Sequence, residues 1–280
     1  MYKIITHPGT AHKDDFLTVS VLLATLGEAE VFRCEPTGTD LTDPATYVVD
    51  VGMEYAPERN NFDHHQDRSL PCAFHLIMQH LGHHDAAKKM FVWYPHMSMM
   101  DVRGPYRTAE HLGVDTSILF ASSSPIDGFV LSLFSRLSIL RSSDLLYKFM
   151  KTLGEELIAL ISHKMVRLER LKNEAEIVSV KHLKAIICTI DDEPKLAMEL
   201  FLRFLNDERI VVSITPAIRG EGWEMLRLEN HRSVDFRVLE NHPAVSFVHV
   251  NGFLAKTYSR LPLPEVLDLV RLAITDSVVT

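Results

Sequence analysis

Tyr47-Val48-Val49-Asp50-Val51-Gly52, followed shortly by Asn61-Phe62-Asp63-His64-His65-Gln66, is the part of the chain that decides the fold. A short apolar run rich in β-branched residues is typical of a buried strand, and this one ends at Asp50. In open α/β sheets, functional groups collect at the carboxyl ends of the strands. An acid and two imidazoles at one such edge indicate a metal site, whereas Asp50 taken alone suits a turn or a cap equally well.

The N-terminal segment has the same organisation as this central stretch. Residues 2–6 predict a buried strand, and Pro8-Gly9 then forces a turn. Apolar residues recur at helical spacing over residues 14–26, so we expect a helix there with Gly27 as its C-cap.

Four polar residues lie around the predicted start of this helix. Asp14 and Asp15 fall in its first turn, where capping is the simplest interpretation because the helix dipole favours negative charge. Capping does not explain His7 and His12, which flank the entry to the helix. We therefore interpret both histidines as candidate metal ligands.

Two more strands follow, and their connections indicate the class of fold. Residues 30–33 and 47–51 predict strands that complete strand–helix–strand units, which favour a mostly parallel sheet. Helices are predicted at residues 71–80 and 85–91. His83-His84-Asp85 follows the end of the first of these helices, so we expect a surface cap rather than a ligand.

Asp101 is a further candidate whose role the spacing leaves open. It ends an apolar helical turn, shortly before Arg103 and the break at Gly104-Pro105. This pair fits a plain salt bridge between the acid and the guanidinium. It fits equally well a metal ligand, Asp101, beside an arginine that binds phosphate.

The second half of the chain predicts a separate, smaller domain. A long helical pattern over residues 143–173 is apolar early and charged later, which is typical of a connector. Strand-like and helical segments then alternate, with strands expected at 185–188, 210–214 and 245–250 and helices at 194–206 and 262–275. We interpret Asn251–Thr257 as a turn, although Gly beside Lys and Thr after a strand also suits phosphate binding.

The predicted fold is therefore α/β with three parts. A parallel-sheet domain is expected at residues 1–142, a helical connector at 143–175 and a smaller α+β C-terminal domain at 176–280.

Bulk composition narrows the class of protein. The 280 residues are 46% hydrophobic and 24% charged, as in an ordinary globular protein, and the net charge of −8 is opposite to that of a long groove for duplex nucleic acid. The dispersed cysteines, Cys34, Cys72 and Cys188, suit core thiols in a reducing compartment. No signal peptide or membrane-spanning run is evident, so we expect a cytoplasmic protein with no membrane partner.

The three motifs together resemble the DHH phosphoesterase superfamily, and most closely its melanocyte-proliferating-gene exonuclease family. The opening Thr-His-x-Gly-x-x-His-x-Asp pattern of that family is present at Thr6–Asp14, its central Val-Val-Asp-Val-Gly to Asp-His-His-Gln pattern at Val48–Gln66, and a Phe-Val-His-x-x-Gly-Phe pattern at Phe247–Phe253. The resemblance implies a catalytic domain, a helical connector and a substrate-binding domain, with the active site between the domains.

The resemblance also implies a two-metal site, transferred residue by residue. His7, His12 and Asp50 would hold one ion, and Asp14, Asp50, His64 and Asp101 the other, so that Asp50 bridges the two. His65 would face the phosphate and Asp63 would orient the histidine pair, both as catalytic residues. Mn²⁺ is the expected metal, with Mg²⁺, Co²⁺ or Zn²⁺ as alternatives, and a bridging hydroxide would attack the phosphorus. Arg103, His249, Gly252 and Lys256 would bind substrate.

The implied function is that of a metal-dependent phosphodiesterase or exonuclease acting on single-stranded RNA or short oligonucleotides. The family's Gly-Gly pair before the lysine is replaced here by Leu254-Ala255. This departure and the acidic net charge favour an alternative, a small-molecule phosphohydrolase acting on pyrophosphate, a nucleotide or a cyclic dinucleotide. A metal-binding module without turnover is a third hypothesis, and an oligomer is compatible with all three.

Overall fold

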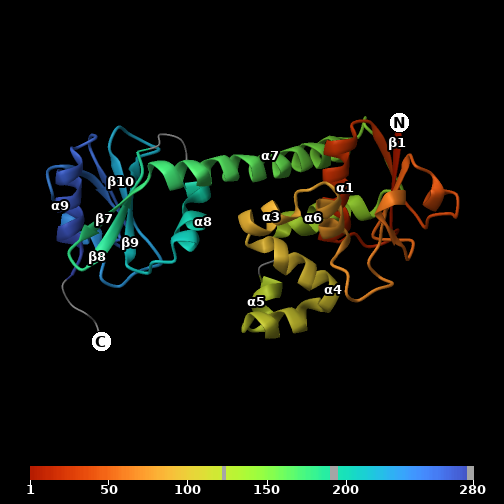
Figure 1. Ribbon diagram of the computed structural model, residues 1–280, viewed down its shortest axis with the longest axis horizontal. Helices are drawn as coiled ribbons and strands as arrows, with labels where there is room; N and C mark the ends of the chain where they lie inside the picture. Colours follow the sequence, from red (N-terminus) through yellow and green to blue (C-terminus); the bar gives the residue numbers. More distant parts are fainter. Residues whose placement is uncertain (122–123, 190–194, 276–280) are drawn as a thin grey trace. The chain divides into compact units, whose positions relative to one another are not determined.

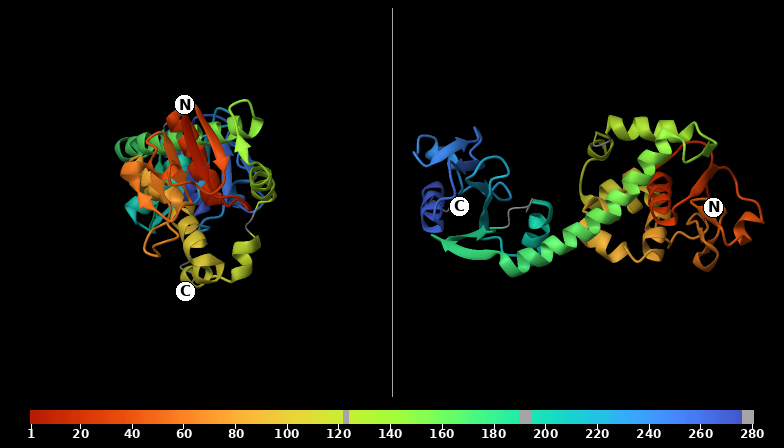
Figure 2. Two further views of the ribbon diagram at one scale, coloured as in Figure 1. Left: turned by 90° about the vertical axis from the view of Figure 1, so that its right-hand side faces the viewer. Right: turned by 90° about the horizontal axis from the view of Figure 1, so that it is seen from above.

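The computed structural model describes residues 1–121, 124–189 and 195–275. The chain divides into two compact units, Met1–Ser162 and His163–Thr280, and the division falls within one helix, α7 (Leu145–Glu174). Figure 2 shows α7 as a continuous helix, as the pattern at residues 143–173 predicts.

The N-terminal unit is built on a six-stranded sheet in the order β4-β5-β3-β1-β2-β6. The four inner strands run parallel, and the two edge strands are antiparallel to their neighbours. The strands are β1 (Tyr2–Thr6), β2 (Ala29–Arg33), β3 (Thr46–Val49), β4 (Tyr55–Ala56), β5 (Asn61–Phe62) and β6 (Ile139–Leu140). The prediction of a mostly parallel sheet is therefore confirmed.

Helix α1 (Lys13–Leu26) packs beside β1 (Figures 1 and 2). Phe16, Val19, Leu22 and Leu23, which recur at helical spacing, are buried, and Gly27 is the C-cap as predicted. A Cβ atom at Gly154 of α7 would lie only 2.1 Å from the carbonyl oxygen of Ser20 in α1. Glycine therefore lets α7 cross α1 closely, which fixes the helix that carries Asp14 and Asp15.

Helices form the rest of the N-terminal unit, α2 (Ala73–His80), α3 (His84–Met90), α4 (Trp93–Leu112), α5 (Thr116–Ala121) and α6 (Pro125–Ser135). The expected break in α4 is present, because Gly104 has φ 77° and precedes Pro105, which lacks a backbone N–H. The chain also contains short 3₁₀ turns, η1 (Asp40–Thr42), η2 (Pro57–Arg59) and η3 (Phe236–Leu239).

The C-terminal unit contains a second six-stranded sheet, in the order β11-β12-β10-β9-β8-β7. Among the strands that the structure describes in this sheet, β8 and β9 are parallel to each other and the remaining neighbours are antiparallel. The elements are β7 (Glu176–Val180), β8 (Leu183–Ile187), α8 (Lys195–Leu205), β9 (Ile210–Pro216), β10 (Trp223–Arg227), β11 (Val245–Val248), β12 (Leu254–Thr257) and α9 (Leu263–Ala273). The predicted combination of a parallel-sheet domain, a connecting helix and a smaller α+β domain is confirmed.

The two faces of this second sheet bury different helices. Along β8, Ala185 and Ile187 pack in the cluster with α9, whereas Ile186 packs in the cluster with α8. This alternation follows the two-residue period of a strand, and Figure 1 shows α8 and α9 on opposite sides of the sheet.

Some expectations need correction. Asn251–Thr257 is not simply a turn, because Leu254–Thr257 forms β12 between β10 and β11. Cys72 and Cys188 are buried thiols, but Cys34 is exposed. The predicted helix at 194–206 is present as α8, although residue 194 lies outside the described residues. In residues 1–121, 124–189 and 195–275, no helix is both long enough and apolar enough to cross a bilayer.

Candidate metal centre

The candidate centre lies at the carboxyl ends of three neighbouring parallel strands. Thr6, Val49 and Phe62 end β1, β3 and β5, and the register pairs Thr6 with Val49 and Val49 with Phe62. The next residues along the chain, including His7 and Asp50, therefore emerge together at one edge of the sheet.

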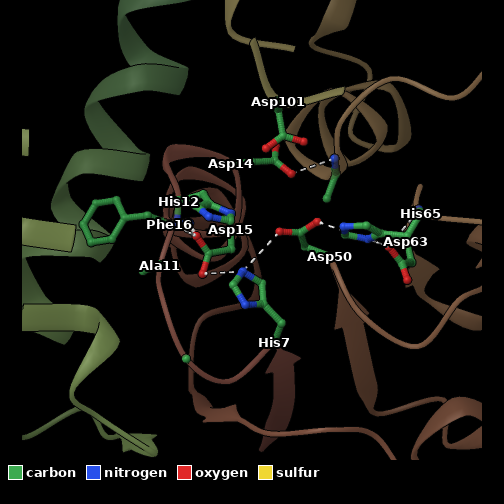
Figure 3. A network of polar contacts seen from close by, with 12 residues as sticks. His7, Ala11, His12, Asp14, Asp15, Phe16, Asp50, Asp63, His65 and Asp101 are labelled. Atoms are coloured by element: carbon green, nitrogen blue, oxygen red, sulfur yellow. Dashed lines mark hydrogen bonds and ion pairs between the residues drawn. The ribbon is translucent and has the colours of Figure 1, made fainter. Parts of the chain in front are cut away.

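Asp50 lies in the middle of the group, with His7 on one side and Asp14 and Asp101 on the other (Figure 3). Its side chain is only 3% exposed, and its φ of 57° is in the left-handed region. One carboxylate oxygen is 3.1 Å from Nε2 of His64, and the other is 3.5 Å from Nε2 of His7. Aspartate and asparagine tolerate this backbone better than most residues, which suits Asp at this strand end.

His7, His12 and Asp50 form a first group whose ligand atoms lie within 4.8 Å of one another. Nδ1 of His7 contacts the Pro8 carbonyl oxygen at 2.9 Å, and because a carbonyl only accepts, Nδ1 carries the proton. Nε2 is buried without a hydrogen-bond partner, and it faces carboxylate oxygens of Asp15 and Asp50 at 3.4 and 3.5 Å. An unprotonated imidazole nitrogen beside two carboxylates is a suitable set of ligands for a divalent cation.

Asp14, His64 and Asp101 form a second group within the same 4.8 Å limit. The Asp14 carboxylate accepts hydrogen bonds from the backbone N–H groups of Ala73 and Phe74, at 2.9 and 2.8 Å, at the start of α2. Asp14 thus caps the first turn of a neighbouring helix. Burial, followed by repulsion from Asp50 and Asp101, raises the pKa of Asp14 well above its ordinary value.

His64 links the two groups, since its Nε2 lies 3.1 Å from Asp50 and 3.2 Å from Asp101. Burial alone would lower the pKa of His64, but the carboxylates of Asp101 and Asp50 raise it to about 10. Without metal, His64 is therefore a cation that partly neutralises the acids. A divalent ion would take its place by displacing the proton.

Asp63 organises the two adjacent histidines. One of its oxygens accepts hydrogen bonds from the backbone N–H of His64 at 2.7 Å and from Nδ1 of His65 at 2.7 Å, and the other accepts from the N–H of Met53 at 2.6 Å. Burial would raise the pKa of Asp63, but the hydrogen bonds from His65 and Met53 lower it overall. The 54% exposed side chain of His65 is left with Nε2 free of this contact.

Asp15 and Arg33 support the centre structurally, a role that the sequence motifs do not predict for either residue. Arg33 ends β2, the fourth parallel strand, and its buried guanidinium lies 3.3 Å from Asp15 and donates to the Gly9 carbonyl oxygen at 2.9 Å. Burial raises the pKa of Asp15 to about 6, although His7, the His12 amide and Arg33 lower it. The signal available in the sequence was the position of Arg33 at a strand end.

Of the four predicted substrate-binding residues, Arg103 belongs to the N-terminal unit, and His249, Gly252 and Lys256 belong to the C-terminal unit. Arg103 lines a neighbouring cavity of the same unit. In the C-terminal unit, Lys256 pairs with the buried Glu224 at 3.0 Å.

His249 and Gly252 occupy one turn of the C-terminal unit, where the Gly252 N–H donates to the His249 carbonyl oxygen at 2.7 Å. Gly252 has φ 64°, and a Cβ there would lie 2.0 Å from an Asp235 oxygen, so this position requires glycine.

His84 is not merely a surface cap. It begins α3, as expected for a helix start, but its Nδ1 lies 2.9 Å from the Tyr94 hydroxyl, and its ring packs against His75. The expectation of a surface cap is therefore corrected, because His84 joins α3 to α4 and α2 through these contacts.

The metal-free protein should lose stability as the pH rises. The folded pKa of His64, about 10, exceeds the unfolded value near 6.5, so its stabilisation is complete below pH 6.5 and is lost as the pH rises through about 10. The raised pKa of Asp14 and Asp15 acts in the same direction at lower pH. From pH 6.5 to 8.5 in EDTA, we expect the free energy of unfolding to fall by about 2 kcal/mol, measured by urea denaturation.

Mn²⁺ should reverse this dependence, because protons compete with the ion for the same side chains. His64→Gln should remove most of the change seen in EDTA. A metal-free protein that became more stable between these pH values would contradict the assigned charge of His64.

Comparison with known proteins supports the resemblance in the N-terminal segment. Residues 3–75 match a family model, MYG1_exonuc, described as "Uncharacterised protein family (UPF0160)". The MYG1 exonucleases of Bos taurus and Rattus norvegicus are each 43% identical over 67 residues, which cover 23% of this chain and 17% of each relative. The predicted resemblance is confirmed for the first two motifs, and the family model ends before the third.

Three solved structures align with this chain at low identity. They are an uncharacterized protein from Helicobacter pylori G27 (9% identity, 99% of this chain and 100% of that chain, TM-score 0.26), an exopolyphosphatase-related protein from Bacteroides fragilis (8%, 97% and 91%, TM-score 0.27) and RecJ in complex with Mg²⁺ from Thermus thermophilus (14%, 97% and 49%, TM-score 0.31). TM-scores at this level carry no conclusion about this chain.

Proposed function

We propose that this chain, whose residues 3–75 match the MYG1 exonuclease family, is a metal-dependent phosphoesterase that hydrolyses single-stranded RNA or short oligonucleotides from an end. The observation that carries the proposal is the pair of ligand groups, His7/His12/Asp50 and Asp14/His64/Asp101. Asp50 of the first group and His64 of the second contact each other at 3.1 Å, so the two groups adjoin. Mixed imidazole and carboxylate donors suit Mn²⁺, and Mg²⁺, Co²⁺ or Zn²⁺ are alternatives.

Bound divalent ions would neutralise the phosphate and activate a water molecule for attack at phosphorus. The residues of the chain supply the rest. Asp50 holds the two groups together, and Asp14 is fixed by the amides of α2. His64 must lose its proton before it can act as a ligand.

We assign His65 to the substrate side of the centre. Its Nδ1–H donates to Asp63, which fixes the ring and leaves Nε2 of an exposed side chain on the substrate side, where the protonated imidazolium form would donate to a phosphate oxygen. In the reaction, the water oxygen bonds to phosphorus while the bond from phosphorus to the ester oxygen breaks. The attacking water gives up one proton to the solvent, and the leaving oxygen takes one, for which Nε2–H of protonated His65 is the proposed donor.

The C-terminal unit is proposed to bind the remainder of the substrate, with His249 and Gly252 in one turn and Lys256 on β12. The pairing of Lys256 with Glu224 reduces the charge available to a polyanion. Together with the net charge of −8, this favours a second candidate, a small-molecule phosphohydrolase.

One assay separates these functions. Protein loaded with Mn²⁺ is incubated with end-labelled single-stranded RNA, with pyrophosphate and with a cyclic dinucleotide, each beside Asp50→Asn protein of equal purity. Stepwise release of mononucleotides from RNA alone supports the exonuclease. Release of phosphate or mononucleotide only from the small substrates supports the second candidate. Equal products from both proteins would show a contaminant and contradict both functions.

Asp63→Asn should lower kcat about 10–100-fold, the usual effect of losing an outer partner of a metal-site histidine. One oxygen of the Asp63 carboxylate accepts hydrogen bonds from Nδ1 of His65 and from the backbone N–H groups of His64 and His65, and the other oxygen accepts one from the Met53 N–H. Asparagine has a single acceptor oxygen, so it cannot accept on both sides. Metal content should remain near that of the native protein. Steady-state kinetics and elemental analysis test this.

Glu58→Gln is the matched control, because its carboxylate is 72% exposed and lies 3.8 Å from the Arg59 guanidinium rather than against a proposed ligand. It should leave kcat and metal content unchanged. A complete loss of metal in Asp63→Asn would show that Asp63 is itself a ligand.

A further inference from the structure

A cavity of about 300 Å³ lies beside the metal centre in the N-terminal unit. Its walls come from residues 68–71, which follow the Asp63-His64-His65 segment, and from α2, α3 and α4. On α4, Pro95, Ser98, Val102 and their neighbours face it at helical spacing. Asp101, of the second ligand group, directly precedes Val102, so the cavity and the centre share both α4 and the chain after His65.

The cavity is positively charged. Arg68, Lys88 and Arg103 reach it from three different segments, and no carboxylate belongs to the part of the lining that the structure describes. Across residues 1–121, 124–189 and 195–275, none of these three cations has an ion-pair partner. Unpaired cations that converge from separate segments are typical of an anion site.

The two histidines of the lining do not add to this charge. Burial lowers the pKa of His75 to about 4, and burial also lowers the pKa of His84. Both are therefore neutral near pH 7, and the two arginines and the lysine supply the positive charge.

Tyr94 fixes the walls in place. The His75 ring stacks on Tyr94 with centroids 3.8 Å apart and contacts the Tyr94 carbonyl oxygen at 2.9 Å, while His84 contacts the Tyr94 hydroxyl at 2.9 Å. The Ser98 hydroxyl accepts a hydrogen bond from the Cys72 N–H at 3.0 Å, which joins α4 to the start of α2. The cavity is thus preformed, which lowers the entropic cost of binding a ligand.

Part of the lining is apolar and comes from Leu70, Pro71, Met99 and Val102. The volume is at the lower end of the range of about 300–1,000 Å³ for small-molecule sites. Inorganic phosphate would use the cations but not this apolar wall. We infer that the cavity binds a nucleoside monophosphate, with the phosphate among Arg68, Lys88 and Arg103 and the ring system against the apolar side chains.

The position of the cavity next to the ligand cluster suits a nucleotide just released by hydrolysis. This assignment as a product site rests on the proposed function, whereas binding itself does not. A product held by three cations would leave slowly and compete with the next substrate.

Isothermal titration of the full chain in EDTA tests the inference without metal or turnover. The probes are adenosine monophosphate, adenosine and inorganic phosphate. The monophosphate should bind at least about 10-fold more tightly than either adenosine or phosphate, because only it uses both the cations and the apolar wall. Absence of monophosphate binding, or equal affinity for all three probes, would overturn the inference.

Matched substitutions locate the site. Arg103→Ala and Lys88→Ala remove exposed cations that line the cavity, whereas Arg107→Ala and Lys89→Ala remove equally exposed cations of the same two helices that do not line it. The first pair should weaken monophosphate binding about 10-fold or more, since a hydrogen bond to a charged group contributes that much. The second pair should leave affinity unchanged, and equal losses in both pairs would overturn the assignment to this cavity.

The two proposals fail separately. Monophosphate binding in EDTA without hydrolysis in Mn²⁺ would overturn only the enzymatic function and the product role. Hydrolysis in Mn²⁺ without monophosphate binding in EDTA would overturn only the cavity assignment.

Discussion

Asp50→Asn is expected to abolish metal binding and to lower hydrolysis at least about 10³-fold, more than the 10–100-fold typical of losing an outer partner of a ligand. Asp50 is the only residue of the described cluster whose two oxygens approach both His7 and His64, so its charge serves both ligand groups. Asn keeps the shape and tolerates φ 57°, whereas Ala would add backbone strain to the loss of charge. Elemental analysis after Mn²⁺ loading, paired with the RNA assay, measures both effects.

The fold should survive this substitution. Without metal, Asp50 contributes to the repulsion that raises the pKa of Asp14, so removing its charge relieves part of the cost of gathering these acids. Glu110→Gln, an exposed carboxylate on α4, should change neither metal content nor rate. If Asp50→Asn retained the native amount of Mn²⁺, Asp50 would not join the two groups.

Arg33→Met is expected to lower the free energy of unfolding by about 3–5 kcal/mol, the usual cost of breaking a buried ion pair from one side. Arg33 is 4% exposed, and its guanidinium contacts Asp15, the carbonyl oxygens of Gly9 and Phe134, and the Phe134 ring. Met fills much of the space but leaves the Asp15 carboxylate buried without its cation. Urea denaturation in EDTA measures this effect independently of metal.

Two comparisons make the Arg33 prediction specific. Arg59→Met removes an exposed arginine paired with Glu54 and should cost less than about 1 kcal/mol. Adding Asp15→Asn to Arg33→Met should restore part of the lost stability, because the uncompensated charge is then gone. Equal costs for Arg33→Met and Arg59→Met would mean that the buried pair contributes no more than a surface one.

The N-terminal architecture could be predicted because local pattern and tertiary position agree there. Val48-Val49 is a buried strand, the turn at Pro8-Gly9 leads into a helix, and strand ends in a parallel sheet meet at one edge. The positions of His7, Asp50 and His64 followed from that geometry. The pairing of Asp15 with Arg33 could not be predicted in this way. A cation at the end of a strand has the same sequence pattern whether its side chain faces solvent or a buried acid.

The C-terminal sheet was harder to predict from local pattern. Leu254–Thr257 contains a lysine and begins two residues after Gly252, which suggests a turn, but it pairs with β10 on one side and β11 on the other. Tertiary pairing overrides weak strand propensity in such a segment. The role of Tyr94 could not be predicted from the sequence either, because its contacts with His75 and His84 join residues from three helices.

The carboxylate of Asp14 joins two segments that lie far apart along the chain, the first turn of α1 and the amides of Ala73 and Phe74. The chemical shift of an amide proton depends on the charge and distance of its acceptor. These two backbone resonances therefore form a built-in spectroscopic reporter. In a ¹⁵N-labelled sample they respond to protonation of the carboxylate and to an arriving cation, without any probe attached to the centre.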